Sequence, residues 1–420
     1  DDKLVRSLIG EGGDVSSYDE DVNFVRLNTY LNEGDIILDG VLGTGSKLPL
    51  RKNISAVLEH VKTYLTDTKS SITVVAVDCP SGINCDTGDT AEQTIPADIT
   101  LSLGAVKCGM LKPPAHLFMG EIKVLSIGEI KHLKSWNSIM DEVGNSKMVS
   151  EFLPKRPRDS HKGLFGTAII VGGSTNYTGA ALLAGKAAAR AGVGLVTLAI
   201  PAPLHPILAG HFPEATWVLL PHEMGVISDK AFDVLSDYLG GSSALLIGPV
   251  LGLEETTGEF VKLLLTDKKT INNSRRIGFL HHGMEVKDCE KLRGLPPTIV
   301  DADGLKLLTK VEGWCNYLPH PAILTPHPGE MSILTSMPIK EVQADRINVA
   351  RKYSIKWGHV VVLKGAFTVI AAPDGRTTTI PFATSALAHA GTGDVLAGMI
   401  AGFRSQGMEA YEAAIAGAWI

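Results

Sequence analysis

The sequence has few cysteines, and their spacing suits neither a disulfide framework nor a metal site. There are five, an odd number, at positions 79, 85, 108, 289 and 315, and no two form a Cys-x-x-Cys pair. This argues against a zinc site of the usual spacing and against a disulfide-rich secreted fold. Reduced thiols of this kind are typical of cytosolic proteins, and the polar start of the chain has no signal peptide. We therefore expect a cytoplasmic location.

Long apolar runs, basic blocks and a phosphate-binding P-loop are also missing. No run of 18 apolar residues is present, which argues against a membrane partner. The 39 basic and 45 acidic residues are mixed along the chain, with a net charge of −6 and no basic block interleaved with aromatic residues. This argues against a nucleic-acid partner. The absence of Gly-x4-Gly-Lys-[Ser/Thr] argues against the P-loop class of nucleotide-binding proteins.

What the chain does have is enough length and apolar sequence for two domains. A chain of 420 residues, 45% hydrophobic and 20% charged, exceeds one ordinary globular core. Residues 141–160 are charged, include Pro154 and Pro157, and show no clear period, so we interpret them as a linker. The expected domains are residues 1–140 and 161–420. Because the chain begins with Asp1 and ends within an apolar helical pattern, we expect a fragment of a longer protein.

Apolar runs of strand length alternate with helical patterns through both halves. Continuous apolar runs are typical of parallel strands that are buried on both faces. Such alternation predicts doubly wound α/β domains, which bind ligands at the carboxyl ends of their strands. A helix is expected over residues 179–191 and another over 339–357. Strands are expected at residues 35–42, 72–77, 99–103, 122–127, 167–171, 195–200, 244–247, 298–300, 323–325 and 359–363.

The stretch from His389 to Gly398 reads as a glycine turn that opens an apolar helix. Gly391 and Gly393 allow positive φ, and the unpaired amides at the start of the helix form an anion site. Asp394 stands at this helix start. Its carboxylate either caps the helix or accepts a proton from a hydroxyl group held beside a phosphate.

Further polar residues of the second half gather near predicted strand ends. Together with Asp394 the set suits phosphoryl transfer, which depends on positioning and charge neutralisation. Lys364 either faces solvent or holds phosphates as a point charge. His327, beside two prolines, is either structural or part of the site. The set comprises His161, Lys162, Asp303, His327, Glu330, Lys364 and Asp394.

In the first half, two aspartates follow neighbouring predicted strands. Asp39 and Asp78 are expected at the same edge of the sheet, where they either share a site or each cap a turn. The glycine cluster from Gly10 to Asp14 is interpreted as a turn.

Motifs of the second half occur in one order: His161-Lys162-Gly163, Gly172-Gly173-Ser174, Tyr177-Thr178-Gly179-Ala180, Asp301-Ala302-Asp303, Thr325-Pro326-His327-Pro328-Gly329-Glu330, Leu363-Lys364-Gly365-Ala366 and residues 391–398. This ordered set resembles the motifs of the ADP-dependent NAD(P)H-hydrate dehydratase family, which has a ribokinase-like fold. The resemblance covers roughly residues 150–420. The first half resembles NAD(P)H-hydrate epimerase, in residues 39–45, 77–82, 88–89 and 97–100, and implies an incomplete Rossmann-like domain. Epimerase followed by dehydratase resembles the bifunctional NAD(P)H-hydrate repair enzymes of prokaryotes.

The dehydratase resemblance implies roles for individual residues. The nucleotide would phosphorylate the hydroxyl group of the hydrated nicotinamide ring, and phosphate would then leave to restore NAD(P)H. Asp394 would be the catalytic base and would also contact the substrate. The substrate-binding site would also be lined by Ala180, Ala181, His327 and the loop that ends at Gly252. The nucleotide would be held by Lys364, Gly365, Ala366, Phe367, Thr368 and Gly393. ADP and Mg²⁺ are the implied cofactors.

The epimerase resemblance implies a potassium site at Asp39 and Ser81 and a proton transfer by Asp78. Hard oxygen ligands suit such a cation. The substrate, NADHX or NADPHX, would be bound by Asp78 and by Gly43, Thr44, Gly45, Ser46, Lys47, Leu48 and Pro49.

Two departures from the family pattern bear on activity. Val250 stands where the dehydratase loop has a glycine, which bears on how closely the backbone approaches the substrate. The epimerase also needs an Asn-Asn-Gly-Gly-Asp loop, and Gly10 to Asp14 lacks the asparagines and lies too near Asp39. We expect the true loop upstream of Asp1, and little epimerase activity from residues 1–140.

Two other functions stay open at this point. A ribokinase-like vitamin or sugar kinase shares the glycine-aspartate helix start, although residues 325–330 favour the hydrate dehydratase. The first half is alternatively a binding or oligomerisation module. We also expect a homo-oligomer.

Overall fold

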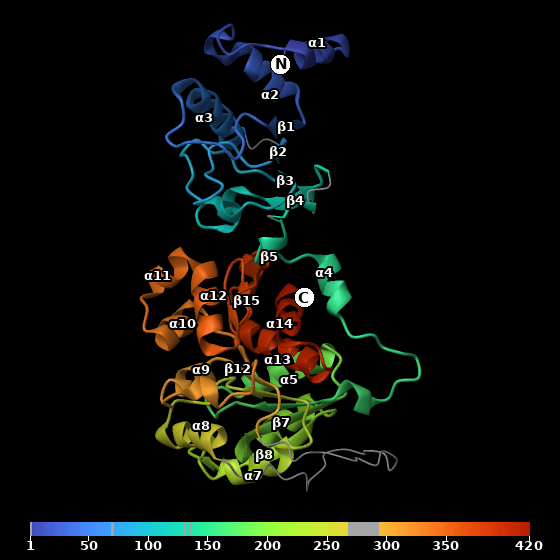
Figure 1. Ribbon diagram of the computed structural model, residues 1–420, viewed down its shortest axis with the longest axis vertical. Coiled ribbons are helices and arrows are strands. Elements are labelled where there is room, and N and C mark those ends of the chain that lie inside the picture. Colours follow the sequence, from blue (N-terminus) through green and yellow to red (C-terminus); the bar gives the residue numbers. More distant parts are fainter. Residues whose placement is uncertain (1, 69–70, 129–131, 135, 268–293) are drawn as a thin grey trace. The chain divides into compact units, whose positions relative to one another are not determined.

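The computed structural model describes residues 2–68, 71–128, 132–134, 136–267 and 294–420 (Figure 1). Contacts divide the chain into two compact units, Asp1–Ser138 and Ile139–Ile420. Among the described residues, no helix combines the length and the hydropathy needed to cross a membrane.

The first unit is built on a parallel sheet whose strands lie in chain order, β1-β2-β3-β4. The register places Asp39, at the end of β1, beside Ala76 of β2. Residues at the carboxyl ends of β1 and β2 therefore lie at one edge. The strands are β1 (Ile36–Asp39), β2 (Thr73–Val77), β3 (Ile99–Leu103) and β4 (Glu121–Leu125), and the helices are α1 (Asp2–Gly10), α2 (Val25–Glu33) and α3 (Lys52–Asp67).

Helices α2 and α3 supply the core of this unit. Leu31 of α2 and Leu58 of α3 pack with Val74 and Ala76 of β2 in one buried cluster. Side chains of a strand alternate between faces, so Val74 and Ala76 share the face that the helices cover. Leu38 of the edge strand β1 is exposed.

The second unit holds a ten-stranded sheet within the described residues, in the order β5-β16-β15-β14-β13-β12-β11-β6-β7-β8. Neighbouring strands run parallel, except that β15 is antiparallel to both β14 and β16. The strands are β5 (Asp141–Val143), β6 (Thr167–Val171), β7 (Leu195–Pro201), β8 (Thr216–Leu220), β11 (Ala244–Ile247), β12 (Thr298–Val300), β13 (Ile323–Leu324), β14 (Val360–Leu363), β15 (Val369–Ala371) and β16 (Thr377–Thr379); β9 (His222–Glu223) and β10 (Val226–Ile227) form a separate pair.

Both faces of this sheet are covered by helices, as the continuous apolar runs predict. Along β14, Val361 and Leu363 belong to one buried cluster, whereas Val360 and Val362 belong to the other. This alternation is the two-residue period of a strand buried on both sides. The first face is covered by α7 (Ala231–Leu239), α8 (Glu255–Thr266), α9 (Asp303–Leu308), α10 (Pro328–Thr335), α11 (Ile339–Ala344) and α12 (Arg346–Trp357). The second is covered by α4 (Ser146–Phe152), α5 (Gly179–Arg190), α6 (His205–Leu208), α13 (Thr392–Ser405) and α14 (Ala410–Trp419).

Two segments differ from the sequence expectations. Part of the expected linker is folded, because β5 pairs with β16 and α4 packs against α14. The helix expected over residues 339–357 is two helices, α11 and α12, since Asp345 has non-helical dihedral angles (φ −146°, ψ 64°). The apolar period continues across this break, which is why the pattern alone predicts one helix.

Candidate functional site

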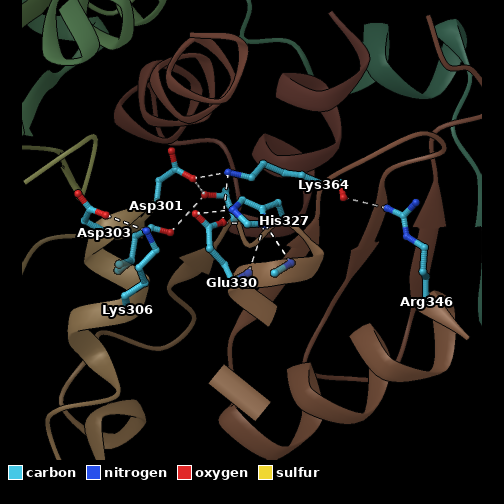
Figure 2. Close-up of polar contacts among 10 residues, drawn as sticks. Asp301, Asp303, Lys306, His327, Glu330, Arg346 and Lys364 are labelled. Carbon is cyan, nitrogen blue, oxygen red and sulfur yellow. Dashed lines mark hydrogen bonds and ion pairs between the residues drawn. The ribbon is translucent and has the colours of Figure 1, made fainter. Parts of the chain in front are cut away.

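Three adjacent strands of the second unit end in polar residues that meet at one point. Asp301 follows β12, Thr325 follows β13, and Lys364 follows β14. Asp301 Oδ1 accepts hydrogen bonds from Lys364 Nζ at 2.7 Å and from Thr325 Oγ1 at 2.6 Å (Figure 2). Asp301 is 1% exposed, so its charge depends on these donors for stabilisation.

His327 and Glu330 close the loop after β13 onto helix α10. His327 Nδ1 accepts hydrogen bonds from the backbone N–H groups of Gly329 and Glu330, and Glu330 Oε2 accepts one from the N–H of His327 at 2.8 Å. This reciprocal arrangement is a capping box. His327 therefore has the structural role that was one of its two interpretations, while Glu330 Oε2 also lies 3.7 Å from Lys364 Nζ.

Lys364 is a buried cation among carboxylates. Burial works against its charge, but Asp301 and Glu330 outweigh this effect and raise the pKa of Lys364. The charge of Asp394 also raises the pKa of Lys364. The interpretation in which Lys364 faces solvent is therefore wrong, because only 16% of its side chain is exposed.

Asp394 lies in the first turn of α13 and not at its cap. Gly391 is the N-cap residue, with φ 93°, which only glycine adopts at no steric cost. Of the two interpretations of Asp394, the helix cap is wrong, since Gly391 occupies the cap and no side chain of the described residues forms a capping hydrogen bond there. Burial, and then the neighbouring Asp301 carboxylate, raise the pKa of Asp394 to about 6, while Lys364 opposes this shift. A carboxylate with such a pKa is suited to accept a proton near neutral pH.

A cavity of about 690 Å³ opens beside the cluster formed by Asp301, Lys364 and Asp394, and Lys364 lines it. Five of the six residues predicted to hold a nucleotide line it, and Phe367, whose φ is 53°, does not. Its remaining wall is largely apolar, with Ile380, Phe382, Leu396, Met399 and Trp419 among the lining residues. The aromatic rings of Phe382 and Trp419 meet edge to face at 5.1 Å. The five predicted residues are Lys364, Gly365, Ala366, Thr368 and Gly393.

The loop after β11 reaches the same edge. Its Pro249 carbonyl accepts a hydrogen bond from the N–H of Gly173, and the N–H of Gly252 donates to Asp303 Oδ2 at 3.1 Å. Asp303 is also paired with Lys306 at 3.0 Å (Figure 2). Val250 has φ 47°, a left-handed conformation that is strained for a β-branched residue. The position that holds glycine in the family pattern therefore has a backbone that favours glycine.

Not every predicted residue of the second unit lies at this edge. His161 and Lys162 precede β6, so they stand at the amino end of that strand, opposite the carboxyl edge. The prediction that they join the site at a strand end is wrong for this reason. Ala180 and Ala181 open α5, but both side chains are buried and Ala181 belongs to the core.

In the first unit, the two residues predicted to bind potassium lie in direct contact. Asp39 Oδ1 accepts a hydrogen bond from Ser81 Oγ at 2.5 Å, and Asp39 Oδ2 accepts one from the N–H of Ser81 at 2.7 Å. Ser81 Oγ in turn accepts a hydrogen bond from the N–H of Leu42, which joins the two strand-end loops. Asp39 is 3% exposed, and no ion pair with lysine or arginine reaches it within the described part of the chain.

Asp78 follows β2 and forms an ion pair with Lys107. Asp78 Oδ1 also accepts a hydrogen bond from the N–H of Leu103 at 3.0 Å, and the residue has φ 70°. Sites under such constraint are often functional. Lys107 further donates to Ser102 Oγ and to the Leu103 carbonyl, so the ammonium group is fixed against the carboxylate.

The remaining predictions for the first unit concern loops. Residues 43–49 form an irregular loop in which Ser46 Oγ donates to the Gly43 carbonyl. The cluster from Gly10 to Asp14 is a turn after α1, and Asp14 accepts a hydrogen bond from Tyr30. The glycine cluster is thus a turn, as expected.

Sequence reasoning missed two kinds of residue. Asp301 lies at the centre of the site, but the sequence analysis named it only within the motif of residues 301–303 and gave it no role, although its position directly after an apolar run is a signal for one. The apolar residues that line the cavity could not be identified in this way. In a helical sequence pattern, an apolar residue such as Trp419 looks the same whether it lines a cavity or lies in the core. Among the described residues, no group of three or more His, Cys, Asp or Glu side chains is arranged to hold a metal ion.

Comparison with known families places both units. The family described as NAD(P)H-hydrate dehydratase matches residues 168–271 and 283–420. The family described as YjeF-related protein N-terminus matches residues 3–109.

Curated relatives match almost the whole chain. A bifunctional NAD(P)H-hydrate repair enzyme of Moorella thermoacetica is 34% identical over 396 residues, which are 94% of this chain and 69% of the relative. A protein of the same description from Salinibacter ruber is 32% identical over 418 residues, or 98% of this chain and 69% of the relative.

Solved structures resemble the second unit. An ADP/ATP-dependent NAD(P)H-hydrate dehydratase from Bacillus subtilis, co-crystallised with ATP and Mg²⁺, is 30% identical with a TM-score of 0.51 and covers 66% of this chain and 86% of its own. A ribokinase-like superfamily protein from Enterococcus faecalis is 25% identical with a TM-score of 0.53 and covers 66% and 85%. These matches favour the hydrate dehydratase over a vitamin or sugar kinase. The chain belongs to the family of bifunctional NAD(P)H-hydrate repair enzymes, and its second unit has the ribokinase-like fold.

Proposed function

We propose that the second unit dehydrates the S form of NAD(P)H hydrate, with ADP as the phosphoryl donor. The observation that carries this proposal is the position of Asp394, in the first turn of α13, where the charges of Asp301 and Lys364 act on it and its neighbour Gly393 lines the cavity. Asp394 takes the proton from the ring hydroxyl group, the hydroxyl oxygen attacks the terminal phosphorus of ADP, and AMP departs. The new phosphate ester then leaves as phosphate while the adjacent ring carbon loses a proton, and the ring double bond of NAD(P)H is restored.

Lys364 supplies the positive charge that this transfer needs. Its ammonium group lies near Gly393, where a Cβ would be 3.5 Å from Nζ, and so stands beside the amide-rich start of α13. Helix starts attract phosphate. Mg²⁺ would enter with the nucleotide and would neutralise phosphate charge, because Mg²⁺ in such sites binds one or two carboxylates together with substrate phosphates.

For the first unit we propose residues that serve epimerisation of the R and S hydrates, at the low rate expected because residues 1–138 contain no Asn-Asn-Gly-Gly-Asp loop. Asp78, held by Lys107, moves the proton. Asp39 and Ser81 provide hard oxygen atoms and an uncompensated buried carboxylate, which fit a monovalent cation such as K⁺. The cation would balance the charge of Asp39. Chromatography of the two hydrates measures their interconversion, first with K⁺ against Na⁺ and then by the unsubstituted chain against Lys107→Ala. An interconversion rate that depends on neither K⁺ nor Lys107 contradicts this proposal.

The kinase alternative is tested by substrate choice. Incubation with ADP or ATP and a panel of vitamin alcohols should leave the alcohols unphosphorylated, whereas NADHX should be converted to NADH. Phosphorylation of an alcohol at a rate above that of NADHX dehydration would replace the proposed function by a small-molecule kinase.

The cysteine usage supports the proposal of a cytoplasmic location. A homo-oligomer is also proposed, and light scattering of the purified chain tests it. A single species of monomer mass across a hundredfold concentration range would contradict it.

A further inference from the structure

Arg346 contacts the backbone of the segment that is proposed to bind nucleotide. It is the first residue of α12, directly after the break at Asp345. Its Nη1 donates to the Ala366 carbonyl at 2.5 Å, and its Nη2 donates to the carbonyls of Leu363 at 2.8 Å and Lys364 at 3.1 Å. Figure 2 shows the guanidinium group of Arg346 joined by a dashed line to the backbone carbonyl of Lys364.

The position of this arginine is unfavourable for the helix itself. A cation in the first turn opposes the helix dipole. The side chain is half-buried, and burial lowers the pKa of Arg346 to about 10, which still leaves it charged at neutral pH. No carboxylate forms an ion pair with it within the described ranges. Three backbone carbonyls are therefore its acceptors.

These three contacts fix the orientation of the peptide groups that follow Leu363, Lys364 and Ala366. In a trans peptide the C=O and the following N–H point in opposite directions. The Leu363 carbonyl faces Arg346, and accordingly the N–H of Lys364 points away and donates to the Pro326 carbonyl at 2.9 Å. By the same geometry, the N–H of Gly365 is turned away from Arg346.

Gly365 shows how closely the segment passes over the guanidinium group. Its φ is 140°, and a Cβ at this position would lie 3.1 Å from both Nη1 and Nη2. Lys364, Gly365 and Ala366 all line the cavity. The backbone is thus held between the arginine on one side and the cavity on the other.

We propose that Arg346 is a positioning residue for the phosphoryl donor: it orients the peptide groups of residues 363–366 so that this segment presents N–H donors and Lys364 to the phosphates of ADP. This rests on the proposed function of the second unit. Backbone N–H groups arranged in succession form anion-binding concavities, and their orientation decides whether they bind. Arg346 acts through the segment and does not touch the phosphates.

The same helix offers a matched control. Arg351 also donates to a backbone carbonyl, that of Gly375, at 2.9 Å, and it pairs with Asp141. Gly375 follows β15 and does not line the cavity. Arg351→Ala therefore removes a cation that joins α12 to the sheet without changing the nucleotide segment.

The experiment compares Arg346→Ala, Arg346→Lys and Arg351→Ala in the 420-residue chain. Calorimetric titration with ADP measures nucleotide affinity without hydrate, and NADHX dehydration measures KM for ADP and for NADHX separately. For Arg346→Ala we expect Kd and KM for ADP to rise about ten- to a hundredfold, as when one or two charge-assisted hydrogen bonds are lost. KM for NADHX should change by less than about threefold. Compared with Arg346→Ala, Arg346→Lys should recover the thermal stability of the unsubstituted chain but only part of its ADP affinity. The reason is that one ammonium group does not span three carbonyls.

Each outcome decides the matter. If Arg351→Ala weakens ADP binding as much as Arg346→Ala, or if KM for NADHX rises as much as KM for ADP, the role of Arg346 is only structural and the inference is wrong. If Arg346→Ala does not fold, Arg346→Lys is judged by the same two comparisons. Failure of the proposed function is distinguishable, because the unsubstituted chain would then bind ADP without dehydrating NADHX.

Discussion

Asp394→Asn is expected to stabilise the folded chain while it removes activity. The amide keeps nearly the shape of the carboxylate but carries no charge and cannot accept the substrate proton. In the folded protein the charge of Asp394 is disfavoured by burial and by Asp301, which together raise its pKa from 3.8 to about 6. Active sites commonly hold such unfavourable charges at the expense of stability.

The magnitude follows from the shift. Two pKa units correspond to roughly 3 kcal/mol, which we reduce to about 1–2 kcal/mol because Asp394 is partly open to solvent. Below pH 3.8 the Asp394 carboxyl group is protonated in both the folded and the unfolded state. Between pH 3.8 and about 6 the unfolded chain ionises while the folded chain stays protonated, so the wild type loses stability as the pH rises through this range. The stability gain of Asp394→Asn should therefore be absent near pH 3.8 and complete above pH 6. The rate should fall on the order of 10²–10⁴-fold.

Urea unfolding of both proteins between pH 4 and 8 measures the first effect, and NADHX dehydration measures the second. Asp301→Asn is the matched control for the electrostatic cause, since it should lower the pKa of Asp394 and shift the rate profile to lower pH. A folded Asp394→Asn protein with near-normal rate would refute its role as base. A stability difference that does not vary with pH would refute the raised pKa.

The remaining predictions concern three separate positions. Lys364→Ala should raise KM for ADP by more than it raises KM for NADHX in steady-state assays, and equal effects would show that Lys364 is not specific to the nucleotide. Val250→Gly should raise the free energy of unfolding by up to about 1 kcal/mol, because relief of the left-handed strain exceeds the entropy cost of glycine; a lower urea midpoint would argue against strain at φ 47°. His359 is fully buried, and burial lowers its pKa to about 4. Below pH 6.5 only the unfolded chain gains its proton, so stability should fall by on the order of 3 kcal/mol from pH 6.5 to 4, and His359→Gln should remove that slope; an unchanged slope would assign it to other groups.

The fold could be predicted from the sequence where local pattern and burial agree. The apolar run of residues 244–247 is β11 at the same bounds, since a strand buried on both faces has no polar residue to blur its ends. The helix expected over 339–357 was wrong at Asp345, because the apolar period runs through the break. An aspartate before an arginine was the signal for a new helix start, but either residue is also common on a helix surface.

The site was predictable in part. Lys364 directly follows β14, and Asp394 was identified from the glycine turn that opens α13, so both could be named from their local sequence. His161 and Lys162 were misplaced because they were grouped with residues that follow strands, although they precede the strand expected at residues 167–171. Arg346 was not predictable, since its role depends on three carbonyls that lie 17 to 20 positions further along the chain.

The most direct test of the central claim is recovery of NADH absorbance from NADHX by the purified 420-residue chain, with ADP and with ATP over a concentration series. We expect NADH to form with Mg²⁺ and ADP, with AMP and phosphate released in equal amounts, and kcat/KM to be higher for ADP than for ATP. Without added nucleotide, we expect that no NADH forms. Formation of NADH without AMP and phosphate would contradict phosphoryl transfer, equal or better turnover with ATP would contradict the choice of ADP, and no NADH at all from a folded, ADP-binding chain would contradict the proposed dehydratase.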